Sequence, residues 1–322
     1  MQSVLVTGGA GFIGSHIVEY LLEHGVKFVR ILDNLSTGSI NNIAHLKYKN
    51  LEFMWGDITN IDTCRKACSN ITLICHQAAL GSVPRSIDDP LVSHNSNVNG
   101  FLNILTVMKE TGIKRIVYAS SSSVYGNNNS DIKHEDEIGT PLSPYAITKY
   151  IDELYARIFT KLYNLECIGL RYFNIFGPRQ DPNGAYAAVI PKFIKIITDG
   201  KSPIINGDGT FSRDFTYVDN AVYANYLALT TDNNKCFGQV FNVGTNNSIS
   251  INTLFQSIKK YLKNDTCYAI YGPERSGDVP YSNACIDKIT EFLGYEPKVY
   301  FEAGLEKTLE YLRNDRNELS IS

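Results

Sequence analysis

The chain has 322 residues, 43% of them hydrophobic, and a formal net charge of -3 at pH 7. Its length exceeds that of one typical domain, so we expect one large α/β unit with a smaller one appended. The near-neutral charge without a basic run argues against nucleic acid as a partner, and no apolar stretch of the sequence reaches the roughly 18 residues of a membrane-spanning helix. The sequence starts directly with an apolar strand, which favours a cytoplasmic protein.

The seven cysteines are an odd number without a CxxC pair, and most lie in apolar runs. They are therefore expected to be reduced thiols in the core rather than a disulfide framework. The six histidines are scattered without the spacing of metal ligands, so no metal site is expected.

The first strand, residues 3–7, runs into a turn that contains Gly8, Gly11 and Gly14, and an apolar-periodic helix follows. Strand, glycine turn and helix form the context that a dinucleotide-binding fingerprint requires. Glycines let the backbone approach a pyrophosphate closely, and the N-terminus of the helix offers unpaired N–H groups to its negative charge. The opening of the chain therefore predicts a dinucleotide site.

The second strand, residues 27–32, is followed directly by Asp33. A carboxylate at this position can accept hydrogen bonds from the adenosine ribose hydroxyls and would repel a 2′-phosphate. Residues 34–38 include no arginine that could hold such a phosphate. NAD is therefore favoured over NADP.

Two further strands, residues 51–55 and 72–76, alternate with helical segments. This alternation predicts an α/β fold with a Rossmann-like, doubly wound parallel sheet, whose ligands lie beyond the carboxyl ends of the strands. Asp57 and Ile58 then fall near the adenine, and residues 77–80 fall near the cofactor's ribose and pyrophosphate. Residues 81–86 have the composition of a polar, turn-rich loop and are expected to form a wall of the substrate site.

A helix is expected over residues 97–111, where apolar side chains recur at helical spacing as a packing face. A strand over residues 115–119 then brings the serines at 120–123 to the same edge of the sheet. A hydroxyl at this edge can hydrogen-bond a reacting oxygen.

Tyr145 and Lys149 stand one helical turn apart, after Pro144, which favours a helix start. A free tyrosine has a pKa of about 10, so it is a poor base at neutral pH unless a nearby cation stabilises the phenolate. Lys149 has the spacing to supply that cation. Alone, the two residues would be an ordinary pair on a helix surface, but with the glycine turn and the serine run they predict a proton-transfer site.

The glycine motif, Asp33, Ser121 and the Tyr145-xxx-Lys149 pattern together resemble the extended short-chain dehydrogenase/reductase family, and the resemblance covers essentially the whole chain. No single motif is specific, but the combination is. Similar enzymes form homodimers through the helices expected at 97–111 and 144–163, so the resemblance implies a homodimer here.

Three later motifs, which begin at Arg171, Asn206 and Arg275, are similar to those of the nucleotide-sugar enzymes in that family. Within this branch, residues 81–86, residues 183–191 and the segment at Arg275 look most like those of the bacterial UDP-N-acetylglucosamine 4-epimerases of surface-polysaccharide pathways. The resemblance thus implies a smaller α/β C-terminal domain that binds a nucleotide sugar.

The resemblance implies NAD as the cofactor. The glycines would hold its pyrophosphate, Asp33 the adenosine ribose, and Lys149 the nicotinamide ribose as well as the phenolate. The residues assigned in this way to the NAD site are Gly8, Gly11, Phe12, Ile13, Gly14, Asp33, Asn34, Ser36, Thr37, Gly38, Asp57, Ile58, Gln77, Ala78, Ala79, Asn97, Tyr145, Lys149 and Tyr172.

The resemblance also implies a UDP-sugar as the substrate. Asn174 would contact the diphosphate, Arg213 and Arg275 would neutralise it, and Asp278 would help bind the uridine side. Planar guanidinium groups suit this task because they match phosphate oxygens in bidentate fashion. The residues assigned to the substrate are Gly81, Ser82, Ser121, Ser122, Tyr145, Asn174, Val189, Asn206, Arg213, Arg275, Asp278 and Ser282.

The residues after Ser121 indicate the type of reaction. Similar 4,6-dehydratases carry an Asp-Glu pair in this segment because water elimination needs a second acid and base, and decarboxylating relatives commonly carry a glutamate. Here Ser122 and Ser123 stand in those positions. We therefore expect oxidation and return of the same hydride, a 4-epimerisation, with Tyr145, Lys149, Ser121 and Ser123 as the catalytic residues.

The expected substrate is UDP-N-acetylglucosamine, with UDP-glucose as a further candidate. Ser282 matches a position where 4-epimerases restricted to plain hexoses carry a bulky tyrosine, and a small side chain leaves room for a 2-acetamido group. UDP-N-acetylglucosaminuronate or UDP-glucuronate is the alternative, because Arg85 could face a carboxylate. A non-catalytic, NAD-binding regulatory protein is a further alternative, although such proteins usually lose the tyrosine or the lysine.

The expected division of the chain is discontinuous. Residues 1–176 would form the NAD-binding Rossmann domain, to which the chain returns within 213–247, with strands near 215–218 and 240–243. Residues 177–212 and 248–322 would form the nucleotide-sugar-binding domain.

Overall fold

A seven-stranded parallel sheet forms the centre of the computed structural model, which describes residues 3–183, 187–274 and 279–319. Every neighbouring pair of strands in this sheet is parallel. In spatial order the strands are β10 (Gln239–Val243), β7 (Glu166–Tyr172), β5 (Arg115–Ser121), β4 (Leu73–His76), β1 (Ser3–Thr7), β2 (Phe28–Asp33) and β3 (Leu51–Trp55).

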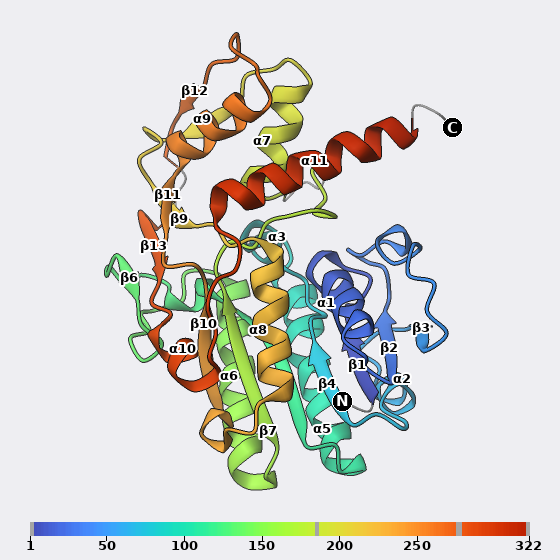
Figure 1. Cartoon of the computed structure of the whole chain (residues 1–322). Coiled ribbons are helices and arrows are strands. Elements are labelled where there is room, and N and C mark those ends of the chain that lie inside the picture. The colour runs from blue at the N-terminus through green and yellow to red at the C-terminus, as the bar shows by residue number, and fades with distance from the viewer. Residues whose placement is uncertain (1–2, 184–186, 275–278, 320–322) are drawn as a thin grey trace.

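Helices cover both faces of the sheet (Figure 1). Side chains alternate between the faces of a strand, so Val4 and Val6 pack into one hydrophobic cluster while Leu5 packs into the other. The described helices are α1 (Phe12–Glu23), α2 (Ile61–Ala67), α3 (Val83–Asp88), α4 (Pro90–His94), α5 (Gly100–Thr111), α6 (Pro144–Tyr163), α7 (Val189–Thr198), α8 (Val218–Thr230), α9 (Ile251–Tyr261), α10 (Asp287–Leu293) and α11 (Phe301–Leu319). Among them, none is both long and apolar enough to cross a membrane.

The first cluster holds α1 and α8 against one face of the sheet, and the second holds α2, α5 and part of α6 against the other. This is the doubly wound, Rossmann-like architecture that the alternation of strands and helices predicts. The seven cysteines are buried free thiols.

Two small sheets lie outside the central one. One contains β11 (Ser248–Ser250), β9 (Ser212–Asp214), β13 (Tyr281–Ala284) and β6 (Ile132–Lys133), and the other contains β12 (Ile270–Gly272) and β8 (Ile204–Asn206). Figure 1 shows β12, α7 and α9 together at one end of the molecule, with α11 crossing beside them. The chain thus returns through β10 to the central sheet before it builds the remainder of this end.

Three local expectations were wrong. Residues 81–86 are not an open loop, because Ser82 caps helix α3 by accepting a hydrogen bond from the Arg85 backbone N–H. The helical segment expected to start at residue 97 begins earlier, since α4 continues through a π-helical turn, Asn95–Asn99, into α5. Residues 215–218 form no strand of the central sheet; Tyr217 makes one isolated bridge with Phe176, and α8 starts directly after it.

Candidate active site

A cavity of about 890 Å³ lies at the carboxyl ends of the central strands. Parallel sheets bind their ligands at this edge. Most of the residues expected at the cofactor or the substrate line it. They are Gly8, Gly11, Phe12, Ile13, Gly14, Asp33, Asn34, Ser36, Thr37, Asp57, Ile58, Gln77, Ala78, Ala79, Gly81, Ser82, Ser121, Ser122, Ser123, Tyr145, Lys149, Tyr172, Asn174, Arg213 and Ser282.

Four expected residues, Gly38, Asn97, Val189 and Asn206, are absent from the described lining of this cavity. Gly38 packs behind the glycine turn, where an added Cβ would come within 2.9 Å of the Ala10 backbone. Val189 starts α7 and Asn206 ends β8. The expected residues Arg275 and Asp278 lie outside the described residues.

The glycine turn is packed too closely for any larger residue. Gly8 has a φ of +69°, and a Cβ there would lie 2.7 Å from the Ala78 backbone nitrogen. A Cβ on Gly14 would lie 2.1 Å from the Gly8 carbonyl oxygen. The result is a bare backbone cradle at the N-terminus of α1, where unpaired N–H groups and the helix dipole favour a phosphate.

The start of helix α6, which carries Tyr145 and Lys149, is fixed from two sides. Ser143 caps it by accepting a hydrogen bond from the Ala146 N–H at 3.1 Å, and Pro144 occupies its first turn. Ser86, which is fully buried in α3, accepts a hydrogen bond from the Tyr145 N–H at 2.9 Å. The wall of the cavity formed by α3 is therefore attached directly to the residue that carries the phenol.

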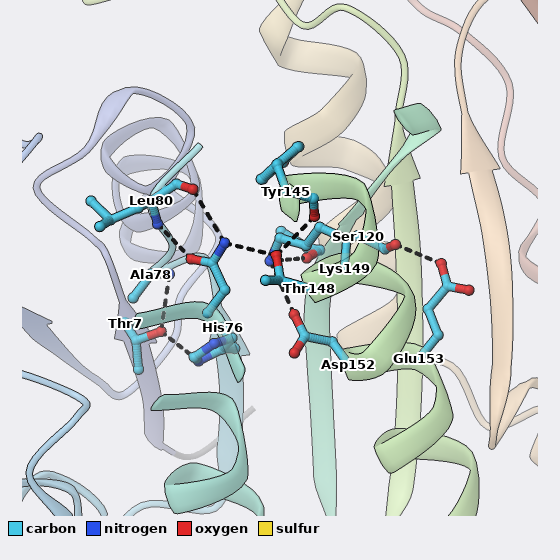
Figure 2. Close-up of polar contacts among 12 residues, drawn as sticks. Thr7, His76, Ala78, Leu80, Ser120, Tyr145, Thr148, Lys149, Asp152 and Glu153 are labelled. Carbon is cyan, nitrogen blue, oxygen red and sulfur yellow. Dashed lines mark hydrogen bonds and ion pairs between the residues drawn. The ribbon is translucent and has the colours of Figure 1, made fainter. Parts of the chain in front are cut away.

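Lys149 lines the cavity from the same helix, and its side chain contacts are drawn in Figure 2. Its ammonium donates a hydrogen bond to the Ala119 carbonyl at 3.0 Å and contacts a carboxylate oxygen of Asp152 at 3.3 Å. The residue is only 2% exposed. A cation is thus held in a low-dielectric setting one turn from Tyr145, where its field is weakly screened.

All four serines of the run line the cavity, and Ser120 also bonds helix α6. Ser120 is 2% exposed and donates a hydrogen bond to Glu153 at 2.6 Å. β5 ends at Ser121, whose hydroxyl accepts from the Ser123 N–H at 3.1 Å at the start of a 3-10 turn. The Ser123 hydroxyl is buried without a hydrogen-bond partner among the described residues. Since Ser123 also lines the cavity, a bound ligand is a natural partner for it.

The family model of the NAD dependent epimerase/dehydratase family matches residues 4–244. The chain belongs to this family. The match spans the glycine cradle, the serine run and helix α6. The family is NAD dependent, so NAD is the cofactor.

Similar proteins match along the whole chain. A putative UDP-glucose 4-epimerase of Methanocaldococcus jannaschii is 40% identical over 97% of this chain and 99% of that protein. The structure of a UDP-N-acetylglucosamine 4-epimerase from Methanobrevibacter ruminantium, in complex with UDP-N-acetylmuramic acid, is 40% identical with a TM-score of 0.91, over 97% and 98% of the two chains. A UDP-glucose 4-epimerase from Thermotoga maritima with UDP-glucose is 38% identical with a TM-score of 0.91, over 98% and 99%.

The acidic residues beside the cradle fit the adenosine half of NAD. Asp33 accepts hydrogen bonds from the Ala10 N–H at 2.9 Å and the Leu35 N–H at 2.8 Å, which fix its carboxylate at the end of β2. Asp57 accepts from Asn34 at 2.8 Å. Burial works against the Asp57 carboxylate, but hydrogen bonds from Thr59 and Asn34 outweigh it and hold its pKa below the usual value.

Asn97 acts from behind the cavity wall instead of lining it. Its side chain accepts from the Leu80 N–H at 2.7 Å and donates to the Leu80 carbonyl at 3.2 Å and to Thr148 at 3.0 Å. Thr148 in turn donates to the Tyr145 carbonyl at 2.8 Å (Figure 2). Asn97 therefore joins the loop after β4 to the catalytic helix, as a positioning residue.

Several residues that line the cavity were not found by sequence reasoning. Gln180 carries a buried amide oxygen that has no hydrogen-bond partner in the described part of the chain. Lys133 is 2% exposed and directs its ammonium to the carbonyls of Asn128 and Ser130. Asp88 lies at the end of α3. No local pattern marks these residues, because only the tertiary fold brings their segments to the cavity.

Proposed function

We propose that the protein is a UDP-sugar 4-epimerase that interconverts UDP-N-acetylglucosamine and UDP-N-acetylgalactosamine. The observation that carries this proposal is the cavity segment of Ser121, Ser122 and Ser123, since the dehydratases that the chain resembles carry an Asp-Glu pair there. The 40% identical Methanobrevibacter ruminantium protein is a UDP-N-acetylglucosamine 4-epimerase, which supports the acetylated hexose.

In this proposal the protein residues move one proton and orient the sugar. NAD, when bound, supplies the hydride chemistry at C4. Tyr145, as the phenolate stabilised by the Lys149 ammonium, removes the proton from O4 as the sugar is oxidised to the 4-keto form. Ser121 donates a hydrogen bond to that oxygen. After the keto sugar turns its other face, Tyr145 returns the proton to O4, so no proton or hydride is gained or lost over the cycle.

The remainder of the cavity offers groups suited to a nucleotide sugar. Arg213 and Asn174 line it, and a guanidinium group can neutralise diphosphate oxygens. Ser82, Ser122 and Ser282 also line it. Because these three side chains are small and polar, they leave volume and hydrogen-bonding capacity for a 2-acetamido group.

The charge of the cavity wall argues against a uronic acid substrate. Arg85, which could have faced a carboxylate, is missing from the cavity lining within the described residues. Asp88 of the same helix lines it instead. Among the described residues of α3, no arginine therefore lies at the cavity to bind a second carboxylate, and this favours the hexose over the uronic acid.

The test is proton NMR of the purified protein incubated separately with UDP-N-acetylglucosamine, UDP-glucose and their uronic acids, without added cofactor. We expect conversion of the acetylated hexose to its C4 epimer. Turnover of the uronic acids alone would contradict the proposed substrate. A 4-keto product or no turnover would contradict the epimerase itself.

Tyr145→Phe tests the role of the phenol in the same assay. We expect the rate to fall by about 10²- to 10⁴-fold, the usual contribution of general acid–base catalysis. Tyr155→Phe, which removes a hydroxyl from the same helix outside the cavity lining, is the matched control and should retain activity. Unchanged epimerisation by Tyr145→Phe would refute the mechanism.

A further inference from the structure

The Lys149 ammonium is buried to a degree at which it needs a nearby negative charge. Its side chain is 3% exposed. Burial disfavours the charged form of lysine and can lower its pKa by several units unless an opposite charge compensates. A neutral Lys149 would provide no cation for the Tyr145 phenolate. A group that keeps Lys149 charged therefore supports the proton transfer by Tyr145.

Three ionisable groups around Lys149 do not supply that charge. His76, on β4, is fully buried, and burial with the nearby Lys149 lowers the pKa of its imidazole to about 3, so it is neutral. Glu153 is committed to Arg171, which donates to its two carboxylate oxygens at 2.9 Å and 2.8 Å. Tyr118, on β5, is fully buried, and burial raises its pKa well above the ordinary value, so it stays a neutral phenol.

Asp152 remains as the counter-ion of Lys149 (Figure 2). One of its carboxylate oxygens lies 3.3 Å from the ammonium, and the other is buried without a hydrogen-bond partner among the residues that the structure describes. The Asp152 side chain is 2% exposed. Burial raises the pKa of this carboxyl, while the ammonium of Lys149 at 3.3 Å acts in the opposite direction and favours the charged carboxylate.

We propose that Asp152 is a positioning residue whose carboxylate keeps Lys149 protonated and thereby maintains the cation that acts on Tyr145. This inference rests on the proposed function, in which Tyr145 is the base. It assigns different tasks to the two adjacent carboxylates of α6. Glu153 joins the helix to the sheet through Arg171 and Ser120, while Asp152 serves the catalytic lysine.

The contact between Asp152 and Lys149 predicts in which direction the pKa of Tyr145 shifts when Asp152 is replaced. Replacing Asp152 by asparagine removes the negative charge beside a buried ammonium, so Lys149 releases its proton more easily. Tyr145 then loses its cation, and its phenolate becomes harder to form. If Lys149 stayed charged without Asp152, the loss of a nearby anion would instead make the phenolate easier to form.

The decisive measurement is a pH titration of Tyr145 by ¹³C NMR in NAD-loaded protein labelled with [ζ-¹³C]tyrosine. The chain has 20 tyrosines, so the Tyr145 signal is identified by its absence from Tyr145→Phe. We expect Asp152→Asn to raise the titration midpoint of Tyr145 by about 1 to 3 pH units, the usual effect of losing a close opposite charge. An unchanged or lower midpoint would overturn the proposal.

Matched variants separate this role from a structural one. Asp199→Asn removes the acid from another lysine pair, Lys195–Asp199, which is about 40% exposed, and should leave the Tyr145 midpoint unchanged. Asp152→Glu restores the charge and should move the midpoint back toward that of the wild type. Asp152→Ser should raise the Tyr145 midpoint as Asp152→Asn does. It is the substitute variant if Asp152→Asn does not fold.

Epimerisation gives a second, separate readout. The pH profile of kcat/KM should narrow in Asp152→Asn, because Tyr145 needs a higher pH to ionise and Lys149 loses its proton at a lower one. A profile of unchanged width would contradict the proposal. The NMR titration of Tyr145 needs no turnover. An absence of epimerase activity would therefore refute the proposed function, while the titration midpoint would still decide the role of Asp152.

Discussion

Arg171 lies at the centre of the most extensive buried ion-pair network of the described structure, and its removal should be strongly destabilising. The side chain is 1% exposed, and its partner Glu153 is 4% exposed. Besides both oxygens of Glu153, the guanidinium donates to the Tyr125 hydroxyl at 3.0 Å and the Glu135 carbonyl at 2.8 Å. Arg171→Met would leave the Glu153 carboxylate buried with only the Ser120 hydroxyl as a remaining donor.

The expected loss in the free energy of unfolding is about 3 to 5 kcal/mol, the range for breaking a buried pair at one partner. Much of this loss is the desolvation of the abandoned charge. Arg171→Met combined with Glu153→Leu should therefore recover a large part of it, because apolar side chains of similar volume can replace a buried pair.

Urea unfolding followed by circular dichroism, at a fixed concentration of NAD, measures both effects. Arg65→Met is the control, because Arg65 pairs with Glu110 at the surface and both side chains are more than 40% exposed. A loss below about 1 kcal/mol for Arg171→Met would refute this reasoning, since that is the range of exposed pairs. A double variant no more stable than the single one would also refute it.

Three further predictions address the cofactor, the substrate and the response to pH. Gly14→Ala should leave the purified protein with little bound NAD, because the new Cβ would lie 2.1 Å from the Gly8 carbonyl oxygen; absorbance of the released cofactor after denaturation measures this, and retention at the wild-type level would contradict the cradle. Ser282→Tyr should lower kcat/KM for UDP-N-acetylglucosamine relative to UDP-glucose by at least about tenfold, because a filled pocket discriminates against the larger ligand. An equal loss of kcat/KM on the two substrates would contradict the placement of Ser282 beside the 2-acetamido group. Burial, with Arg179 nearby, lowers the pKa of His16 from 6.5 to about 4, so the folded state keeps this imidazole neutral while the unfolded chain binds a proton. The free energy of unfolding of the wild type should therefore fall as the pH drops from 6.5 toward 4, with His16 contributing up to about 1.4 kcal/mol per pH unit. In urea titrations at pH 7 and pH 5, His16→Asn should lose less of this free energy than the wild type. Equal losses in the two proteins would show that His16 is not responsible.

Local signals in the sequence predicted the elements that carry the chemistry. The glycine turn requires residues without a Cβ, and the structure shows backbone atoms at the positions that a Cβ would occupy. The expected catalytic helix coincides with α6, Pro144–Tyr163, because its serine cap and first-turn proline are contiguous in the chain. In each case the physical constraint acts over a few neighbouring residues, so it is readable from the order of the residues alone.

One local expectation failed where distant segments meet. The polar composition of residues 81–86 is that of a loop. In the structure Ser86 belongs to helix α3 and is buried against the start of α6. The resemblance implied a place near the cofactor for Asn97, and this stays a prediction. Its side chain is absent from the described lining of the cavity and bonds to Leu80 and Thr148.

The sequence by itself determined the family, the cofactor and the type of reaction for which the site is suited, because these depend on residue types at short, fixed spacings. Only the tertiary structure decided which of two adjacent carboxylates, Asp152 or Glu153, contacts Lys149. Both stand within one turn of the lysine, and Arg171, which claims Glu153, arrives from a separate strand. The electrostatics of a buried site depend on which charges meet after folding, and contacts of that kind have no local signature in the chain.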